Sequence, residues 1–80
     1  MKLPREVSGA ALVKGLKKLG YVVTRQKSPH IRMTTRQNGE HHVTVPDHDH
    51  VKVGVLADIL KDVADHLGLE RDELLDQLFG

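Results

Sequence analysis

The sequence contains no cysteine and no tryptophan, and Tyr21 and Phe79 are its only tyrosine and phenylalanine. Without thiols the chain can form no disulfide and offer no thiolate nucleophile, and zinc would have to rely on histidine and carboxylate ligands. So few aromatic rings also provide little platform for stacking successive bases of a single strand. The longest apolar stretch, residues 53–57, is cut at once by Asp58, so no segment looks like a membrane span or a signal peptide. We therefore expect a cytoplasmic protein that does not enter a membrane.

Charge is divided unevenly along the 80 residues. Residues 1–36 carry nine lysines and arginines against Glu6 alone, a net charge of +8, whereas residues 37–80 carry three basic and ten acidic side chains, a net charge of −7. A chain polarised in this way can offer one face to phosphate groups while the other stays solvated or meets a basic partner. The alternative is that both charged regions are simply solvated surface.

Hydrophobic periodicity predicts three helices and three strands. Ser8 is a suitable N-cap for a first helix that ends near Gly20, and a second helix ends at Gly68. An alternating pattern marks strands at residues 21–24, 30–36 and 41–45. The apolar residues expected on the core face of the second helix are Val53, Leu56, Ile59, Leu60, Val63 and Leu67.

These elements predict an α+β fold. We expect residues 1–68 to form an α-β-β-β-α domain with one three-stranded antiparallel sheet, helices on one face and the other face open. Residues 69–80 would add a short acidic helix to the same domain. Its residues Leu74, Leu75 and Leu78 would either close the core or contact a partner.

The turn between the second and third strands decides which side chains reach the open face. A two-residue loop at Asn38-Gly39 would pair residues whose numbers sum to 77 and separate Ile31 and Met33 from Val43 and Val45. A three-residue loop, with Gly39 in the left-handed conformation, gives a sum of 76 and gathers all four apolar side chains on one face, so we favour it. The open face then carries His30, Arg32, Thr34, Arg36, His42 and Thr44.

His30 and Arg32 lie about 7 Å apart along the second strand. An imidazole exchanges a proton near neutral pH, and a guanidinium can hold a phosphate through two hydrogen bonds. RNA cleavage needs a base for the 2′-hydroxyl, an acid for the leaving oxygen and positive charge at the phosphate, which this pair could supply. His42 lies about 13 Å from His30, too far to act on the same phosphate. His48 is the candidate second histidine, because Pro46 pairs opposite His30 and the chain turns there.

Lys14, Lys17 and Lys18 form a basic stripe on the first helix, opposite its leucines. Recognition of RNA by shape, phosphate and 2′-hydroxyl suits this stripe better than base stacking does. Metal binding by residues 40–42 or 47–50 is a weaker alternative, since His41 and His42 point to opposite faces and no second cluster has zinc spacing. We expect no metal and no other cofactor.

The assembled residues resemble the HicA/YcfA-like mRNA interferase toxin family from Met1 to about Gly68. No single segment is distinctive, but their order and spacing are rather specific. The matching segments are Leu3-Pro4-Arg5, Ser8-Gly9, Leu16-Lys17-Lys18-Leu19-Gly20-Tyr21, Arg25-Gln26-Lys27, His30, Val43-Thr44-Val45-Pro46 with His48, and Leu56 to Leu60.

The resemblance implies a fold like that of double-stranded-RNA-binding domains, ribosome-independent mRNA cleavage and inhibition by a HicB-like antitoxin. It also implies that His30 is catalytic. In this hypothesis the RNA- and phosphate-binding residues are Lys14, Lys17, Lys18, Arg25, Lys27 and Arg32. The family usually has Gly-Ser-His where this chain has Ser28-Pro29-His30, and proline fixes φ and lacks an N–H. A non-catalytic RNA-binding module is therefore the alternative, and the free protein could be a monomer or a dimer.

Overall fold

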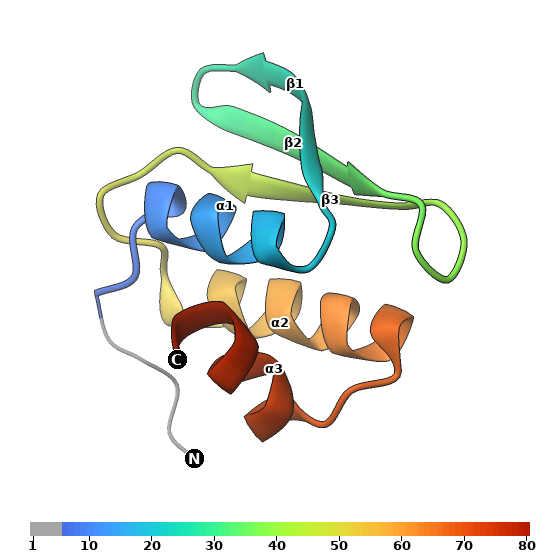
Figure 1. Cartoon of the computed structure of the whole chain (residues 1–80). Coiled ribbons are helices and arrows are strands. Elements are labelled where there is room, and N and C mark those ends of the chain that lie inside the picture. The colour runs from blue at the N-terminus through green and yellow to red at the C-terminus, as the bar shows by residue number, and fades with distance from the viewer. Residues whose placement is uncertain (1–5) are drawn as a thin grey trace.

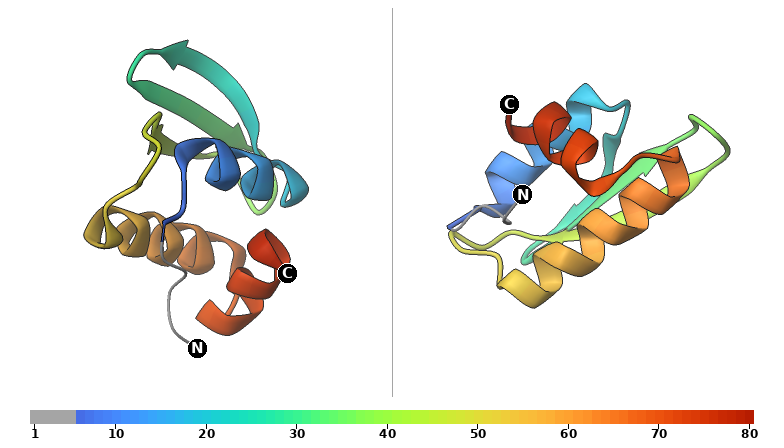
Figure 2. Two further views of the ribbon diagram at one scale, coloured as in Figure 1. Left: turned by 90° about the vertical axis from the view of Figure 1, so that its left-hand side faces the viewer. Right: turned by 90° about the horizontal axis from the view of Figure 1, so that it is seen from below.

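The computed structural model describes residues 6–80, so the Leu3-Pro4-Arg5 segment lies outside the described part. The three strands form one antiparallel sheet in the order β1-β2-β3, with the helices on one side of it (Figures 1 and 2). The predicted α+β fold is therefore confirmed. The elements are α1 Gly9–Lys18, β1 Val22–Lys27, β2 His30–Thr35, β3 His41–Pro46, α2 Val53–Leu67 and α3 Arg71–Phe79.

Helix α1 begins and ends where its sequence signals place it. The Ser8 hydroxyl accepts a hydrogen bond from the Ala11 N–H at 3.0 Å, and Gly20 adopts φ +94° just beyond the helix. A side chain at Gly15 would run into Leu78 of α3, so this glycine lets the two helices approach closely. Leu12, Leu16 and Leu19 of the α1 segment are buried in the core.

Helix α2 buries most of its predicted face, and α3 completes the core. Leu56, Ile59, Leu60 and Val63 are buried, and Leu67 packs partly against them. Leu74, Leu75 and Leu78 are also buried, which shows that α3 closes the core. A capping box between Glu70 and Glu73 starts this last helix.

The prediction for Val53 was wrong, because this side chain is 60% exposed. Val51 takes the core position instead and is only 5% exposed. The Val51 N–H donates to the Val7 carbonyl at 2.8 Å, which holds the segment before α2 against the N-terminal segment. The helix then starts two residues later, with Val53 pointing to solvent.

Strands β2 and β3 pair in the register predicted for a three-residue loop. His30 pairs with Pro46, Arg32 with Thr44 and Thr34 with His42, so paired numbers sum to 76. Gly39 has φ +95°, and the four apolar residues Ile31, Met33, Val43 and Val45 are all buried. The paired region stops at Thr35 and His41, so Arg36 lies in the loop rather than in the strand.

Strand β1 runs three residues further than the expected end at Thr24, because it keeps pairing with β2 up to their connecting turn. The register shifts between Val23 and Arg25, which marks a bulge at Thr24. Beyond the bulge, Arg25 lies opposite Arg32 and Lys27 opposite His30. No helix within residues 6–80 combines the length and the apolar content that crossing a membrane requires.

Candidate functional site

His30 lies at the end of the open sheet face nearest the β1–β2 turn. It is the first residue of β2, between Lys27 of β1 and Pro46 of β3. His30, Lys27, Arg25, Arg32 and Thr44 line a shallow hollow of about 360 Å³. All five are exposed, so the imidazole is within reach of a large ligand. The structure therefore gathers four of the predicted site residues, one imidazole and three cations, on one accessible surface.

Backbone hydrogen bonds tie this end of the sheet together. The β1–β2 turn contains a cis Ser28–Pro29 peptide bond, and the Pro29 carbonyl accepts a hydrogen bond from the Asp47 N–H at 2.7 Å. The turn that precedes His30 is thereby fastened to the segment that follows β3.

The start of α1 is anchored to the same end. The Gly9 N–H donates to the His48 carbonyl at 2.8 Å, and a Cβ at Gly9 would collide with the carbonyl oxygen of Pro46, the residue paired with His30. The Ser8-Gly9 pair in the sequence thus has two physical roles: the serine caps α1, and the glycine allows the helix to meet the end of β3.

His48 takes part in this anchoring through its backbone. Its side chain is exposed, and it is not among the described residues that line the hollow at His30. Its role as a second functional histidine stays a prediction. Within residues 6–80, no three histidine, aspartate or glutamate side chains come together in a way that would hold a metal ion.

The lysine stripe belongs to a different surface. Lys14, Lys17 and Lys18 are exposed on α1, which lies on the helix-covered side of the sheet (Figure 2). The His30 side chain belongs to the other, open face. The Lys18 ammonium lies 3.5 Å from the Leu78 carbonyl, near the end of α3. The structure does not bring these lysines to the hollow at His30.

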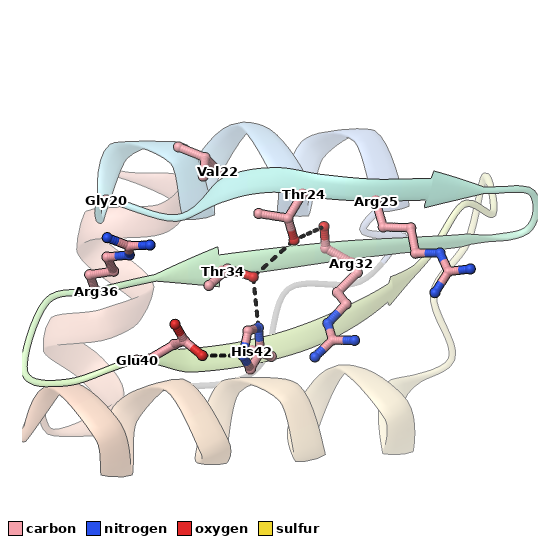
Figure 3. Close-up of a pocket in the computed structure, with 9 residues that line it drawn as sticks. All are labelled: Gly20, Val22, Thr24, Arg25, Arg32, Thr34, Arg36, Glu40 and His42. Carbon is pink, nitrogen blue, oxygen red and sulfur yellow. Dashed lines mark hydrogen bonds and ion pairs between the residues drawn. The ribbon is translucent and has the colours of Figure 1, made fainter.

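A larger hollow of about 630 Å³ lies on the same open face (Figure 3). Arg25 and Arg32 line both hollows, so the two are adjacent. In the larger hollow a row of side chains is joined by hydrogen bonds. Glu40 Oε2 is 3.1 Å from His42 Nε2, and His42 Nδ1 is 2.7 Å from Thr34 Oγ1. Thr34 Oγ1 is in turn 2.9 Å from Thr24 Oγ1. Arg36 also lines this hollow.

Sequence reasoning placed Thr34 and His42 on this face but missed their contact. The signal was present, because a register with a sum of 76 pairs residue 34 directly with residue 42. Directly paired side chains on one face of a sheet lie close enough to interact. Thr24 could not be placed in this way, since the bulge in β1 shifts its position.

A second row of hydrogen bonds lies on the helix side of the sheet. The Tyr21 hydroxyl is 2.8 Å from His41 Nδ1, and His41 Nε2 is 3.1 Å from Asp62 Oδ1 of α2. The His41 ring stacks on that of His66 at 4.3 Å, and His66 Nε2 donates to the carbonyls of Gln37 and Gly39.

Burial, and then the charge of Asp62, raise the pKa of Tyr21 to about 12. At neutral pH the phenol therefore keeps its proton, and its hydrogen bond to His41 ties the segment between α1 and β1 to β3. His41 in turn ties β3 to α2 through Asp62.

The family model for the HicA toxin of bacterial toxin–antitoxin systems matches residues 9–64, from the start of α1 to near the end of α2. This is more than half of the chain and includes both hollows of the open face. No curated protein and no solved structure matches the chain.

Proposed function

Because the chain belongs to the HicA toxin family of bacterial toxin–antitoxin systems, we propose that it is an endoribonuclease that cleaves mRNA without the ribosome. The observation that supports this most is the placement of His30 on an open face beside Arg25, Lys27 and Arg32. Family membership also implies an antitoxin partner, which we propose to be HicB-like and to meet the toxin in the cytoplasm.

The chemistry required of His30 is modest. The imidazole accepts the proton of a ribose 2′-hydroxyl while that oxygen attacks the neighbouring phosphorus and the bond to the 5′-oxygen breaks. The products are a 2′,3′-cyclic phosphate and a 5′-hydroxyl, whose proton comes from the imidazolium or from water. Arg32 and Lys27 hold the phosphate and offset the charge that develops on its oxygens. No metal is needed for this reaction.

The test is cleavage of an mRNA transcript by His30→Ala, with His50→Ala as a matched control. His50 is an exposed histidine in the loop after β3 and lines neither hollow. We expect His30→Ala to lower the cleavage rate by about 10²–10⁴-fold and to keep RNA binding, while His50→Ala changes neither. Growth arrest on induction should disappear with His30→Ala only. Equal cleavage by both variants would show that His30 is not catalytic.

The lysine stripe has a different proposed role. Lys14, Lys17 and Lys18 are too far around the molecule to hold the phosphate at His30, so we propose that they attract RNA at long range. Replacing all three with alanine should weaken binding of every RNA sequence and flatten its dependence on salt, with little change in the cleavage rate of bound RNA.

The second candidate function is RNA binding without cleavage, and Ser28-Pro29 at the turn before His30 favours it. The family's usual Gly-Ser supplies a hydroxyl next to the histidine, and this chain has proline there. A protein that shifts RNA on a gel, yet never produces 2′,3′-cyclic ends, would support this candidate. Restoring serine with Pro29→Ser should then restore cleavage.

A further inference from the structure

We propose that the larger hollow is a second phosphate site, and that the Glu40 carboxylate occupies it when no RNA is bound. The site is formed by Arg36 and His42, with Arg32 lying between it and the hollow at His30, and its ligand is a phosphate group of the strand whose cleavage we assign to His30. The identity of the ligand as RNA rests on the proposed function, whereas affinity for a phosphate anion does not.

The larger hollow carries positive charge that no carboxylate balances within residues 6–80. Arg25, Arg32 and Arg36 all line the hollow. In the described part of the chain no carboxylate forms an ion pair with any of the three. Guanidinium groups bind phosphate oxygens through two hydrogen bonds and lose less hydration than an ammonium does. Three of them in one hollow, without partners, therefore favour an anionic ligand.

Among the described residues that line the hollow, Glu40 alone carries a carboxylate. It accepts a hydrogen bond from His42 Nε2 at 3.1 Å, because a carboxylate can only accept. Its side chain is 61% exposed and comes from the loop before β3, so it can swing away into solvent. A phosphate oxygen can then take its place on His42 Nε2. The carboxylate thus stands in for the ligand.

The row behind His42 keeps the imidazole in position during that exchange. Thr34 is only 8% exposed and lies within hydrogen-bond distance of both His42 Nδ1 and Thr24 Oγ1. Thr24 is in turn 3.4 Å from the Arg32 carbonyl. When the imidazole is charged, Nδ1 donates to the Thr34 hydroxyl, which donates to Thr24, which donates to the Arg32 carbonyl. When the imidazole is neutral, the hydroxyls of Thr34 and Thr24 rotate, so that Thr34 donates to Nδ1 and Thr24 donates to Thr34. His42 and Thr34 are therefore preorganised for an anion in either charge state.

The spacing fits a second phosphate rather than the one that is cut. Thr34, which pairs with His42, lies four residues along β2 from His30, a distance of about 13 Å. Arg25 and Arg32 line both hollows and make the basic surface between them continuous. One RNA strand can lie along this surface with separate phosphates at the two histidines.

The experiment measures binding of a fluorescent 12-nucleotide RNA to the full chain carrying His30→Ala, so that the RNA stays intact. In this background Arg36→Ala should weaken binding by about 5- to 10-fold. It should also make the slope of log affinity against log salt concentration shallower, by the amount expected for about one lost phosphate contact. Glu40→Gln should instead strengthen binding by about 3- to 10-fold, because the competing carboxylate is gone. The matched control is Asp58→Asn on α2, which makes the same charge change away from the open face and should alter binding less than twofold.

Equal effects of Glu40→Gln and Asp58→Asn, or full affinity in Arg36→Ala, would overturn the proposal. A peptide of glutamates that binds more tightly than RNA of equal charge, and loses binding in Arg36→Ala, would also overturn it and assign the face to an acidic protein. Folding of each variant is checked by its amide NMR spectrum.

A titration with inorganic phosphate separates this proposal from the proposed function. In the unmodified chain, phosphate should shift the amide signals of Thr34 and His42 with saturation, and Arg36→Ala should abolish the shift. If these signals shift but no RNA is ever cleaved, the second site stands and the nuclease fails. If RNA is cleaved through His30 and phosphate leaves these signals unchanged, the second site alone fails.

Discussion

His41 and His42 are neighbours in the sequence, and each imidazole joins a carboxylate to a hydroxyl on opposite faces of one strand. His41 links Asp62 to Tyr21 on the helix side, where its side chain is only 17% exposed and stacks on His66. The Tyr21 side chain that it contacts is completely buried. The row joins the segment before β1, strand β3 and helix α2. It therefore acts as a structural clasp.

The row through His42 has the same chemistry in a different setting. His42 links Glu40 to Thr34, and its side chain is 38% exposed. It lines a hollow together with Arg25, Arg32 and Arg36, none of which forms an ion pair with a carboxylate within residues 6–80. The comparison shows that a hydrogen-bonded triad of carboxylate, imidazole and hydroxyl does not indicate function by itself. Access and the surrounding charge decide whether such a row holds the fold together or can meet a ligand.

The largest expected effect is on stability, and it separates the two histidines. His41→Ala leaves the buried Tyr21 hydroxyl without a partner and removes the ring that stacks on His66. We expect the free energy of unfolding to fall by about 2–4 kcal/mol. His42→Ala should cost about 1 kcal/mol or less, because water can reach the groups it leaves. Urea denaturation measures both, and similar losses would contradict the distinction drawn between the two rows.

The second effect concerns alkaline pH. The pKa of Tyr21 is raised to about 12 in the folded chain, against 10.0 as its ordinary value. Below pH 10.0 the phenol is protonated in both the folded and the unfolded state, so its titration does not reduce the free energy of unfolding. As pH rises toward 12 the unfolded state alone loses the proton, so the free energy of unfolding should fall by on the order of 2 kcal/mol.

The single tyrosine makes that effect easy to follow. Ultraviolet absorbance of the phenolate reports its titration directly, and Tyr21→Phe should remove this share of the pH dependence from urea denaturation curves. A phenolate that appears near its ordinary pKa, in a protein that is still folded, would show that the clasp is open to water.

A smaller effect is expected at the hydroxyl of the open-face row. Thr34→Val keeps the shape of the side chain but removes the group shared by Thr24 and His42. We expect a loss of about 1 kcal/mol in the free energy of unfolding. Thr44→Val is the matched control, since Thr44 is exposed on the same face and should change stability by less than about 0.5 kcal/mol. Identical values for both would mean that the row contributes nothing to the fold.

The smallest effects should come from the carboxylates at the two outer ends. Asp62 and Glu40 are 59% and 61% exposed, so water competes with each histidine for them. Asp62→Asn and Glu40→Gln should each change stability by about 0–1 kcal/mol. Asp62→Asn should also lower the pKa of Tyr21, because one of the causes that raise it is removed. If either variant lowered the free energy of unfolding by much more than expected, the carboxylate would be the main stabilising group of its row.

Local rules were enough to predict much of this fold. Ser8, Gly20 and Gly68 mark helix ends through capping and left-handed backbone, and parity in β2 and β3 sets the register and the open face. The failures arise where distant segments meet. Val51 is buried in the core instead of Val53, because the Val51 N–H donates a hydrogen bond to the Val7 carbonyl. Hydrophobic periodicity within α2 does not reveal this contact with a distant segment.

The candidate site was predicted in part for the same reason. His30, Arg25, Lys27 and Arg32 lie on neighbouring strands, so pairing rules bring them together. The clasp through Asp62 depends on how α2 lies across the sheet, and Thr24 depends on a bulge, so neither could be read from spacing. The lysine stripe lies on α1 as predicted, and its separation from His30 already followed from the expectation that the helices cover one face of the sheet while His30 lies on the other.

Surface loops usually tolerate insertions and deletions, but the loop at residues 36–40 should tolerate them poorly in the course of evolution. Loss of a single residue there would turn His42 and Thr44 toward the helices and expose Val43 and Val45, because every side chain of β3 would change face. His66 Nε2 also donates to two carbonyls of this loop, from Gln37 and Gly39. Related chains should therefore differ in the length of this loop by even numbers of residues, or carry a compensating bulge in β3.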